Sequence, residues 1–267
     1  MNKKYIWIIL ALSLATHFAF FGEPAETVFD EIHFGKFVSG YFTGEYFFDI
    51  HPPLGKLIIA GMAKLSGFEP GFSFETIGQE FTDDVYKWLR FLPKLAGAIL
   101  PIVVFFIALE LGISQRFAFL AGLLIIFENA LLVQSRFILL DSFLLLFGFL
   151  AIFFFLKFRS SDSIFYILYS SFFAALAASI KLTGLSFLAI ILILYLFEFL
   201  KRFNYTAYAV KLKYIFKGLI LLIIIPFLIY LSVFAVHFSL LDKTGPGLAF
   251  HPPNFQEMSI FEKFTEL

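Results

Sequence analysis

Long apolar runs, each closed by a short polar break, constrain this chain more than any other feature. Crossing the roughly 30 Å of hydrocarbon in a bilayer takes about 20 helical residues. The stretch 117–156 is about twice that length, so we expect it to turn once along its course. The polar residues that mark this turn are Gln134, Ser135, Arg136 and Asp141. The stretch 164–200 is expected to turn in the same way at residues 181–184.

Composition also indicates a membrane protein. Hydrophobic residues make up 60% of the chain and charged residues 15%, and the mean hydropathy is +0.90. Soluble domains usually carry about 25% charged residues. We predict an all-α, polytopic membrane helix bundle of about seven spans, at residues 5–21, 89–109, 117–133, 138–156, 164–180, 182–200 and 214–236. The net charge of zero gives no basic field for nucleic acid, and the lack of cysteine excludes disulfides and thiolate metal ligands.

Basic residues near the span ends predict the orientation, because cytoplasmic loops are enriched in lysine and arginine. With the amino terminus inside, the short outer turns hold only Arg136 and Lys181. The inner segments hold Lys3, Lys4, Arg116, Lys157, Arg159, Lys201, Arg202, Lys211, Lys213 and Lys217. The acidic residues expected inside are only Glu110, Asp162 and Glu198. The segments 22–88 and 237–267 are then expected outside.

The outer segment 22–88 is too long to be a simple connection. Helical spacing near its start predicts a helix lying in the membrane interface, carried by Phe34, Phe37, Val38 and Tyr41. A second interfacial helix is expected over 54–65, where Pro52 and Pro53 suit a helix start. The sequence shows no internal repeat, no low-complexity linker and no separate soluble domain.

Asp30 and Glu31 follow the first span on its outer side. Adjacent helical residues project about 100° apart, so one carboxylate can face a site while the other anchors the segment. A positioned carboxylate can act as a general base. The alternative is a solvated pair that caps the next helix, because Asp is common at such positions. The pair alone does not decide between the two.

Basic groups on the same face are candidates for binding a lipid phosphate. His51 and Lys56 flank a double proline, which restricts the backbone around His51, and Asp49 precedes them. Arg90 lies at the outer end of the second span, and Lys94 lies one turn deeper. The alternative for these long basic side chains is snorkelling of the charge to the interface.

The outer turns place further polar groups at membrane depth, where ionisable side chains are costly and face a cavity or each other. These groups include Glu128, Arg136, Asp141 and Lys181. Arg136 and Lys181 can supply positive charge for an anion. Alternatively, Arg136 and Asp141 form an ion pair that closes the turn. His17, inside the first span, is expected to be a hydrogen-bonded structural histidine.

Several of these residues belong to longer motifs. The motifs are Val28-Phe29-Asp30-Glu31-Ile32-His33-Phe34-Gly35, Asp49-Ile50-His51-Pro52-Pro53-Leu54-Gly55-Lys56-Leu57, Glu128-Asn129-Ala130, Gln134-Ser135-Arg136-Phe137-Ile138-Leu139-Leu140-Asp141-Ser142, Lys181-Leu182-Thr183-Gly184-Leu185, and His237-Phe238 with Thr244-Gly245-Pro246-Gly247. Taken in order, they resemble the protein O-mannosyltransferase family, membrane glycosyltransferases of the GT-C class. The resemblance runs from about residue 22 to residue 256.

The resemblance implies transfer of mannose, with inversion, from a polyprenyl (dolichyl) phosphate carrier to Ser or Thr hydroxyls of proteins. Asp30 is then expected to be the catalytic base, and Glu31 to orient the loop or the acceptor. Arg90 is the first candidate for binding the departing phosphate. The other candidates are His51, Lys56, Arg136 and Lys181, with Asp49, Glu128 and Asp141 as supporting residues. The family is metal-independent, so no metal and no other cofactor is expected.

Two departures from the family pattern shape the remaining expectations. Glu128 stands where the family usually has Asp, and the chain ends after about seven predicted spans where family members continue. We therefore expect residues 1–267 to be the amino-terminal portion of a GT-C domain, with an incomplete tail at 237–267. The expected partners are polyprenyl-phosphate-mannose, acceptor proteins, membrane lipids, and a second chain in a homo- or heterodimer.

Composition also bears on where the protein is located. The Phe-, Ile- and Lys-rich composition and the lack of a β-trefoil MIR segment favour a prokaryotic plasma membrane over the endoplasmic reticulum. The nearest rival is another GT-C transferase with a lipid or wall acceptor, followed by a non-catalytic partner subunit. A transporter is less favoured, because Pro101 and Pro226 interrupt spans without marking matched halves.

Overall fold

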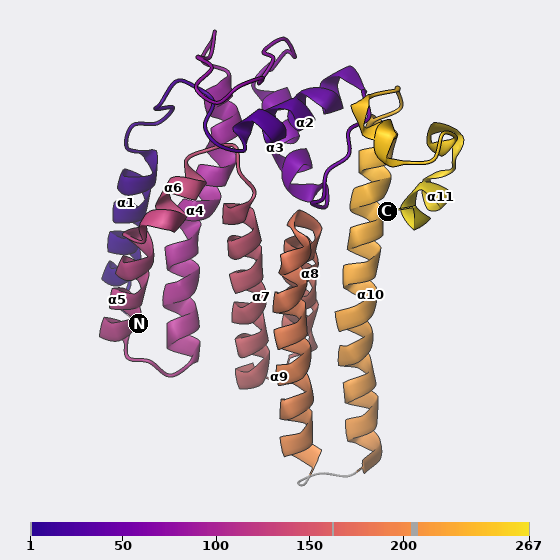
Figure 1. Cartoon of the computed structure of the whole chain (residues 1–267). Helices are drawn as coiled ribbons and strands as arrows, with labels where there is room; N and C mark the ends of the chain where they lie inside the picture. The colour runs from indigo at the N-terminus through magenta and orange to yellow at the C-terminus, as the bar shows by residue number, and fades with distance from the viewer. Residues whose placement is uncertain (1, 162, 204–207, 267) are drawn as a thin grey trace.

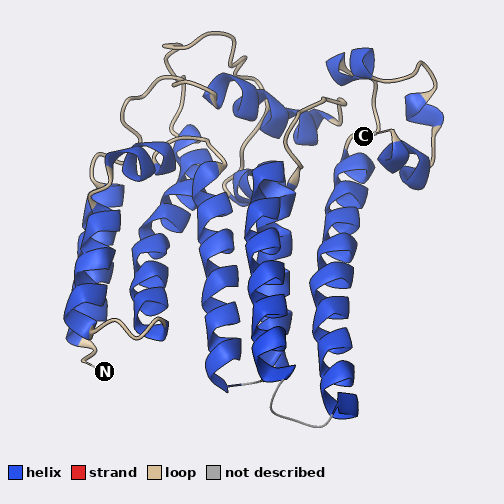
Figure 2. Ribbon diagram, turned by 60° about the horizontal axis from the view of Figure 1, so that its bottom comes forward, coloured by secondary structure: helices blue, strands red, loops and turns tan. Residues whose placement is uncertain are grey.

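The computed structural model describes residues 2–161, 163–203 and 208–266, and within these ranges it contains helices and two isolated β-bridges but no strand (Figure 2). The α-helices are α1 Lys4–Phe18, α2 Glu31–Thr43, α3 Leu54–Leu65, α4 Tyr86–Glu110, α5 Gln115–Ile126, α6 Asn129–Ser135, α7 Asp141–Ser161, α8 Ile164–Ile180, α9 Leu185–Phe203, α10 Tyr208–Leu240 and α11 Ile260–Thr265. Short 3₁₀ helices are η1 Leu182–Gly184, η2 Pro246–Phe250 and η3 Phe255–Glu257. Of the predicted inner charges, Asp162 lies outside the described residues, as do the side chains of Arg202, Lys211 and Lys213.

Apolar helices form a bundle whose members run side by side (Figure 1). Among the described residues, three are long and apolar enough to cross a membrane, namely α4, α7 and the part Phe216–Leu240 of α10. The bent pair α5 and α6 makes a fourth if it forms one span. The shorter apolar helices are α1, α8 and the segment Leu182–Glu198. Each of the seven predicted spans thus coincides with an apolar helical segment, and the fold is the predicted membrane helix bundle.

The third predicted span, 117–133, is divided between two helices. α5 ends at Ile126, and α6 continues at an angle of 56°. The reason lies at Glu128, whose backbone is extended and whose carboxylate accepts a hydrogen bond from the Leu131 N–H at 2.7 Å. This cap satisfies one of the donors that every helix start leaves free, so a new helix begins there in a new direction.

The outer segment carries both predicted interfacial helices, and α3 has the predicted limits 54–65. α2 and α3 lie across one end of the bundle (Figure 1). Their apolar faces join the main core, where Val38 and Ile59 are both fully buried. Gly35 of α2 packs against the Phe74 ring, so a Cβ there would lie 2.2 Å from it. The outer segment is therefore a packed layer over the bundle.

The tail after α10 is attached to this layer. The Tyr46 N–H donates to the Lys243 carbonyl at 3.1 Å, and the Lys243 N–H donates to the Gly44 carbonyl at 2.9 Å. Gly247 continues the pairing with a bond to the Tyr46 carbonyl at 3.1 Å. The amino terminus lies at the opposite end of the bundle (Figure 1). The two segments predicted to be outside therefore share one end, as the predicted orientation requires.

Candidate functional site

Asp30 lies at the start of α2, at the end of the bundle covered by the outer segment. Phe29, directly before it, has a φ of 51°, a left-handed conformation that is uncommon for bulky residues and clusters at functional sites. The Asp30 side chain is partly exposed, and no hydrogen bond or ion pair joins it to another described residue. Asp30 occupies the N-cap position of α2, but its side chain makes no capping hydrogen bond. Its carboxylate is therefore not occupied by a contact with another described residue.

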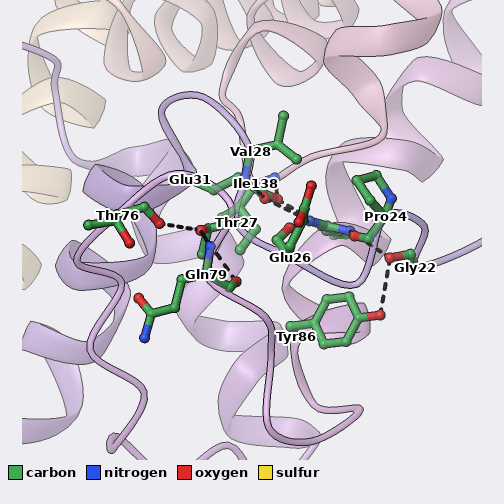
Figure 3. A network of polar contacts seen from close by, with 11 residues as sticks. Gly22, Pro24, Glu26, Thr27, Val28, Glu31, Thr76, Gln79, Tyr86 and Ile138 are labelled. Carbon is green, nitrogen blue, oxygen red and sulfur yellow. Dashed lines mark hydrogen bonds and ion pairs between the residues drawn. The ribbon is translucent and has the colours of Figure 1, made fainter.

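Glu31, in contrast, is fully buried and saturated with hydrogen bonds. Its Oε1 accepts from the Arg90 Nε at 2.7 Å and from the Ile138 backbone N–H at 2.8 Å. Its Oε2 accepts from the Arg90 Nη2 at 2.7 Å and from the Val28 N–H at 2.8 Å. Figure 3 shows the groups of Val28 and Ile138 converging on this carboxylate. Glu31 therefore connects the start of α2 to α4 and to the segment that precedes α7.

Arg90 is the other half of this buried pair and is also fully buried. Its Nη1 donates to the carbonyl oxygens of Gly22 and Pro24, and its Nη2 donates to that of Glu26, each at 2.7 Å. Together with the two bonds to Glu31, all five N–H groups of the guanidinium are used. No N–H is left for a phosphate in this arrangement. Through these hydrogen bonds Arg90 holds the backbone of the segment 22–31 in place.

A second polar cluster lies around α3 and the outer ends of α7 and α8. Lys56 is buried, forms an ion pair with Asp49, and donates to the His51 carbonyl at 2.7 Å. Lys181 donates to the two carboxylate oxygens of Asp141 at 2.8 and 2.9 Å. The charges of all four side chains act on the pKa of the His51 ring. We call these five residues the basic cluster, because three of them can carry positive charge.

Burial decides the proton affinities in the basic cluster. It lowers the pKa of Lys56 to about 8, although the carboxylate of Asp49 opposes this shift. Burial also lowers the pKa of His51, where Asp49 and Asp141 oppose the shift and Lys181 and Lys56 add to it. His51 is therefore neutral near pH 7, and an anion placed beside it would favour its charged form.

Glu128 and Arg136 make contacts with other elements. Glu128 caps α6, and the Arg136 Nη2 donates to the Thr16 carbonyl of α1 at 3.2 Å. The alternative ion pair between Arg136 and Asp141 is not formed, because Asp141 pairs with Lys181. His17 is hydrogen-bonded as expected, with its Nδ1 2.9 Å from the Ser13 carbonyl.

Two tyrosine–histidine pairs near the basic cluster were not predicted. The Tyr41 hydroxyl lies 2.8 Å from the His237 Nδ1, and the Tyr46 hydroxyl lies 3.0 Å from the His251 Nε2. The partners are 196 and 205 residues apart, so no local pattern signals them. A cavity of about 20 Å³, room for a water molecule, has a lining that includes Tyr46, Asp49, His51, Lys56 and His237. α10 thus contributes His237 to the wall of the candidate site, and the tail residue His251 contacts Tyr46 of the same wall.

Comparison with known proteins connects this geometry to a family. A family model described as dolichyl-phosphate-mannose-protein mannosyltransferase matches residues 7–242. The chain belongs to this family. Protein O-mannosyltransferase 1 of Drosophila melanogaster is 34% identical over 258 residues, which cover 91% of this chain and 28% of that protein. Dolichyl-phosphate-mannose–protein mannosyltransferase 4 of Candida albicans is 35% identical over 265 residues, which cover 94% of this chain and 35% of that protein.

A solved member of the mannosyltransferase family shares the fold. It is the Saccharomyces cerevisiae Pmt1–Pmt2 complex bound to the sugar donor, with a TM-score of 0.91 and 30% identity over 96% of this chain and 36% of that chain. The chain therefore spans 28–36% of the length of these mannosyltransferases. These relatives come from an insect and two yeasts, so the prokaryotic membrane favoured by composition gains no support from them.

Proposed function

We propose that this chain transfers mannose from polyprenyl-phosphate-mannose to Ser or Thr hydroxyls of proteins, at the outer face of the membrane. Family membership supports the reaction class, and the relatives are named for this donor and for protein acceptors. The observation that carries the proposal is the contrast within the acidic pair. Asp30 is partly exposed and unbonded, whereas four hydrogen bonds saturate the buried Glu31.

In this mechanism Asp30 takes the proton of the acceptor hydroxyl while the hydroxyl oxygen attacks C1 of mannose. The bond between C1 and the phosphate oxygen breaks, and the phosphate leaves with the electron pair. One base is enough, because no covalent intermediate forms and C1 is inverted. Glu31 cannot take this role while its oxygens are occupied. It acts instead by fixing the backbone on both sides of Asp30.

The leaving phosphate needs fixed positive charge. We assign this task to Lys181 and His51 and give Lys56 a supporting role. The Lys181 side chain is 18% exposed and can exchange Asp141 for a phosphate, whereas the Lys56 side chain is 1% exposed and bonded. A monophosphate carries less charge than a diphosphate, so the reaction does not demand a metal. Within the described residues, no three His, Cys, Asp or Glu side chains are grouped for metal binding, and metal independence stays a prediction.

The proposal includes a partner chain. The solved relative is a complex of two mannosyltransferases, and this chain spans 36% of the matched one. We propose that the active form is a dimer, homomeric or heteromeric. The outer face is the lumen of the endoplasmic reticulum in a eukaryotic cell and the exterior side of the plasma membrane in a prokaryote.

Asp30→Asn is the central test. The full-length protein, with its partner, is placed in liposomes with polyprenyl-phosphate-mannose and a Ser/Thr peptide. Loss of a general base should lower transfer by about 10²- to 10⁴-fold, with donor binding retained. Glu69→Gln removes an exposed carboxylate of the same outer segment and should leave transfer near the wild-type rate. Unchanged mannosylation by the Asp30 variant would contradict its role as base.

The same assay separates the rival functions. If polyprenyl-phosphate-mannose gives no Ser/Thr-linked product while another polyprenyl-phosphate sugar does, the mannosyl assignment fails and the transferase class stands. If the partner chain transfers mannose equally well with wild-type and Asp30→Asn protein, this chain is a non-catalytic subunit.

A further inference from the structure

Lys94 is a buried cation of α4 that the proposed mechanism does not use. Its side chain is 1% exposed. Its Nζ lies 4.7 Å from the centre of the Phe21 ring and 6.0 Å from that of Phe18. No hydrogen bond or ion pair joins it to another described residue. Aromatic faces attract a cation but do not replace a hydrogen-bond acceptor, so the ammonium group lacks its usual partners.

Arg136, directly after α6, is a second cation in the same region. One of its nitrogen atoms, Nη2, donates to the Thr16 carbonyl at 3.2 Å. Its Nε is buried and has no hydrogen-bond partner among the described residues. The arginine therefore leaves a buried donor unsatisfied, which costs free energy unless a further acceptor arrives.

Close packing brings these groups together where α1, α4 and α6 meet (Figure 1). A Cβ on Gly97 would lie 2.5 Å from the Ser135 side chain and 3.1 Å from the His17 ring. The charged groups near enough to act on Lys94 are Arg136 and Arg90, and both are positive. Glu31 already neutralises Arg90. Among the residues that the structure describes, neither Lys94 nor Arg136 forms an ion pair with a carboxylate.

Aromatic side chains indicate the depth of this region in the membrane. Phe91 lies 5.8 Å from the ring centre of Phe18 and 5.8 Å from that of Trp88. Trp88 is 44% exposed, and Phe20 is 77% exposed. Tryptophan is enriched at the level of lipid headgroups, so the exposed Trp88 marks this level at the start of α4. The two cations therefore lie where lipid phosphates are found.

We infer that Lys94 and Arg136 form a binding site for the phosphate group of a membrane phospholipid, between α1, α4 and α6. Basic pockets between membrane helices bind such headgroups, and the several oxygens of a phosphate group can accept from lysine and arginine donors. The site is distinct from the basic cluster, whose residues come from α3, α7, α8 and the chain before α3. It is also independent of the proposed sugar transfer.

Native mass spectrometry of the delipidated full chain tests this inference. Phosphatidylglycerol is titrated into wild-type protein, Lys94→Met and Arg136→Gln, with phosphatidylcholine as the zwitterionic reference. Each variant should bind its first phosphatidylglycerol about fivefold more weakly, the effect of one basic residue at an anionic surface. Lys64→Met, which removes an exposed lysine at the end of α3, should leave this affinity unchanged.

Equal affinity of the wild type and both variants would overturn the inference, and so would an equal loss in the Lys64 variant. A thermal melt shows whether each variant is folded and gives a second measure of lipid binding. Phosphatidylglycerol should raise the melting temperature of the wild type more than that of either variant, because a ligand stabilises the state that binds it. Excess sodium phosphate then identifies the source of the phosphate group. Displacement of the lipid assigns the site to a soluble phosphate, and no displacement assigns it to a lipid.

Discussion

Replacing Arg90 by glutamine removes one charge of a fully buried ion pair while keeping a polar side chain. Arg90 and Glu31 are both 0% exposed, and the guanidinium donates five hydrogen bonds of 2.7 Å. Glutamine has two N–H donors, so at least three of these bonds are lost and Glu31 keeps an unpaired charge. Removing one partner of a buried pair costs about 3–5 kcal/mol. That is a large part of the about 5–15 kcal/mol that holds a typical domain folded.

The assay is unfolding of the protein in nanodiscs, combined with limited proteolysis of the segment 22–31. Arg90→Gln should unfold at a lower temperature and should be cut in this segment, because the carbonyl groups of Gly22, Pro24 and Glu26 lose their donors. Lys87→Gln is the matched control, one turn away on α4. The Lys87 side chain is 33% exposed and that of its partner Asp84 is 83% exposed, so loss of this solvated pair should change stability little.

A double-mutant cycle separates the ion pair from general damage. Combining Glu31→Gln with Arg90→Gln removes both charges, so the double variant should be more stable than the sum of the two single losses predicts. The reasoning is refuted if Arg90→Gln melts and is cleaved like the wild type. It is also refuted if the two single losses are additive.

Two further predictions follow from close contacts and from burial. Gly245→Ala places a Cβ 2.3 Å from the Tyr46 carbonyl oxygen, so unfolding measurements should show a loss of stability of about 1–3 kcal/mol. Gly61→Ala is the control, because open space surrounds that position. It should be neutral or should stabilise the protein by up to about 1 kcal/mol. Equal stability of the two variants would contradict the close contact. Because burial lowers the pKa of His51 below 6.5 in the folded state, the unfolded chain binds that proton more tightly. Wild-type stability should therefore fall as pH drops through 6.5, and His51→Gln should show a shallower fall in its melting temperature. Identical pH profiles would exclude this contribution.

Local signals were sufficient to predict the elements of the bundle. α8 and α3 begin and end at the predicted residues, because an apolar run closed by polar residues and a proline-led start are both properties of neighbouring residues. The break between α5 and α6 was not predicted at its true position. The run 117–133 is apolar throughout most of its length, and only the cap at Glu128 shows that the helix restarts there.

For the candidate site as well, the sequence predicted which side chains lie at the outer face, and the tertiary structure decided which of them are free. Sequence alone placed Asp30 and Glu31 together at the outer face, and it placed Arg90 at the outer end of a span. It could not tell which carboxylate would be free. Tertiary structure decided this, because a partner 59 residues away and the backbone N–H of Ile138 both converge on Glu31. An ion pair excluded from water requires partners on every oxygen and N–H, and only the folded chain brings together residues so far apart in sequence.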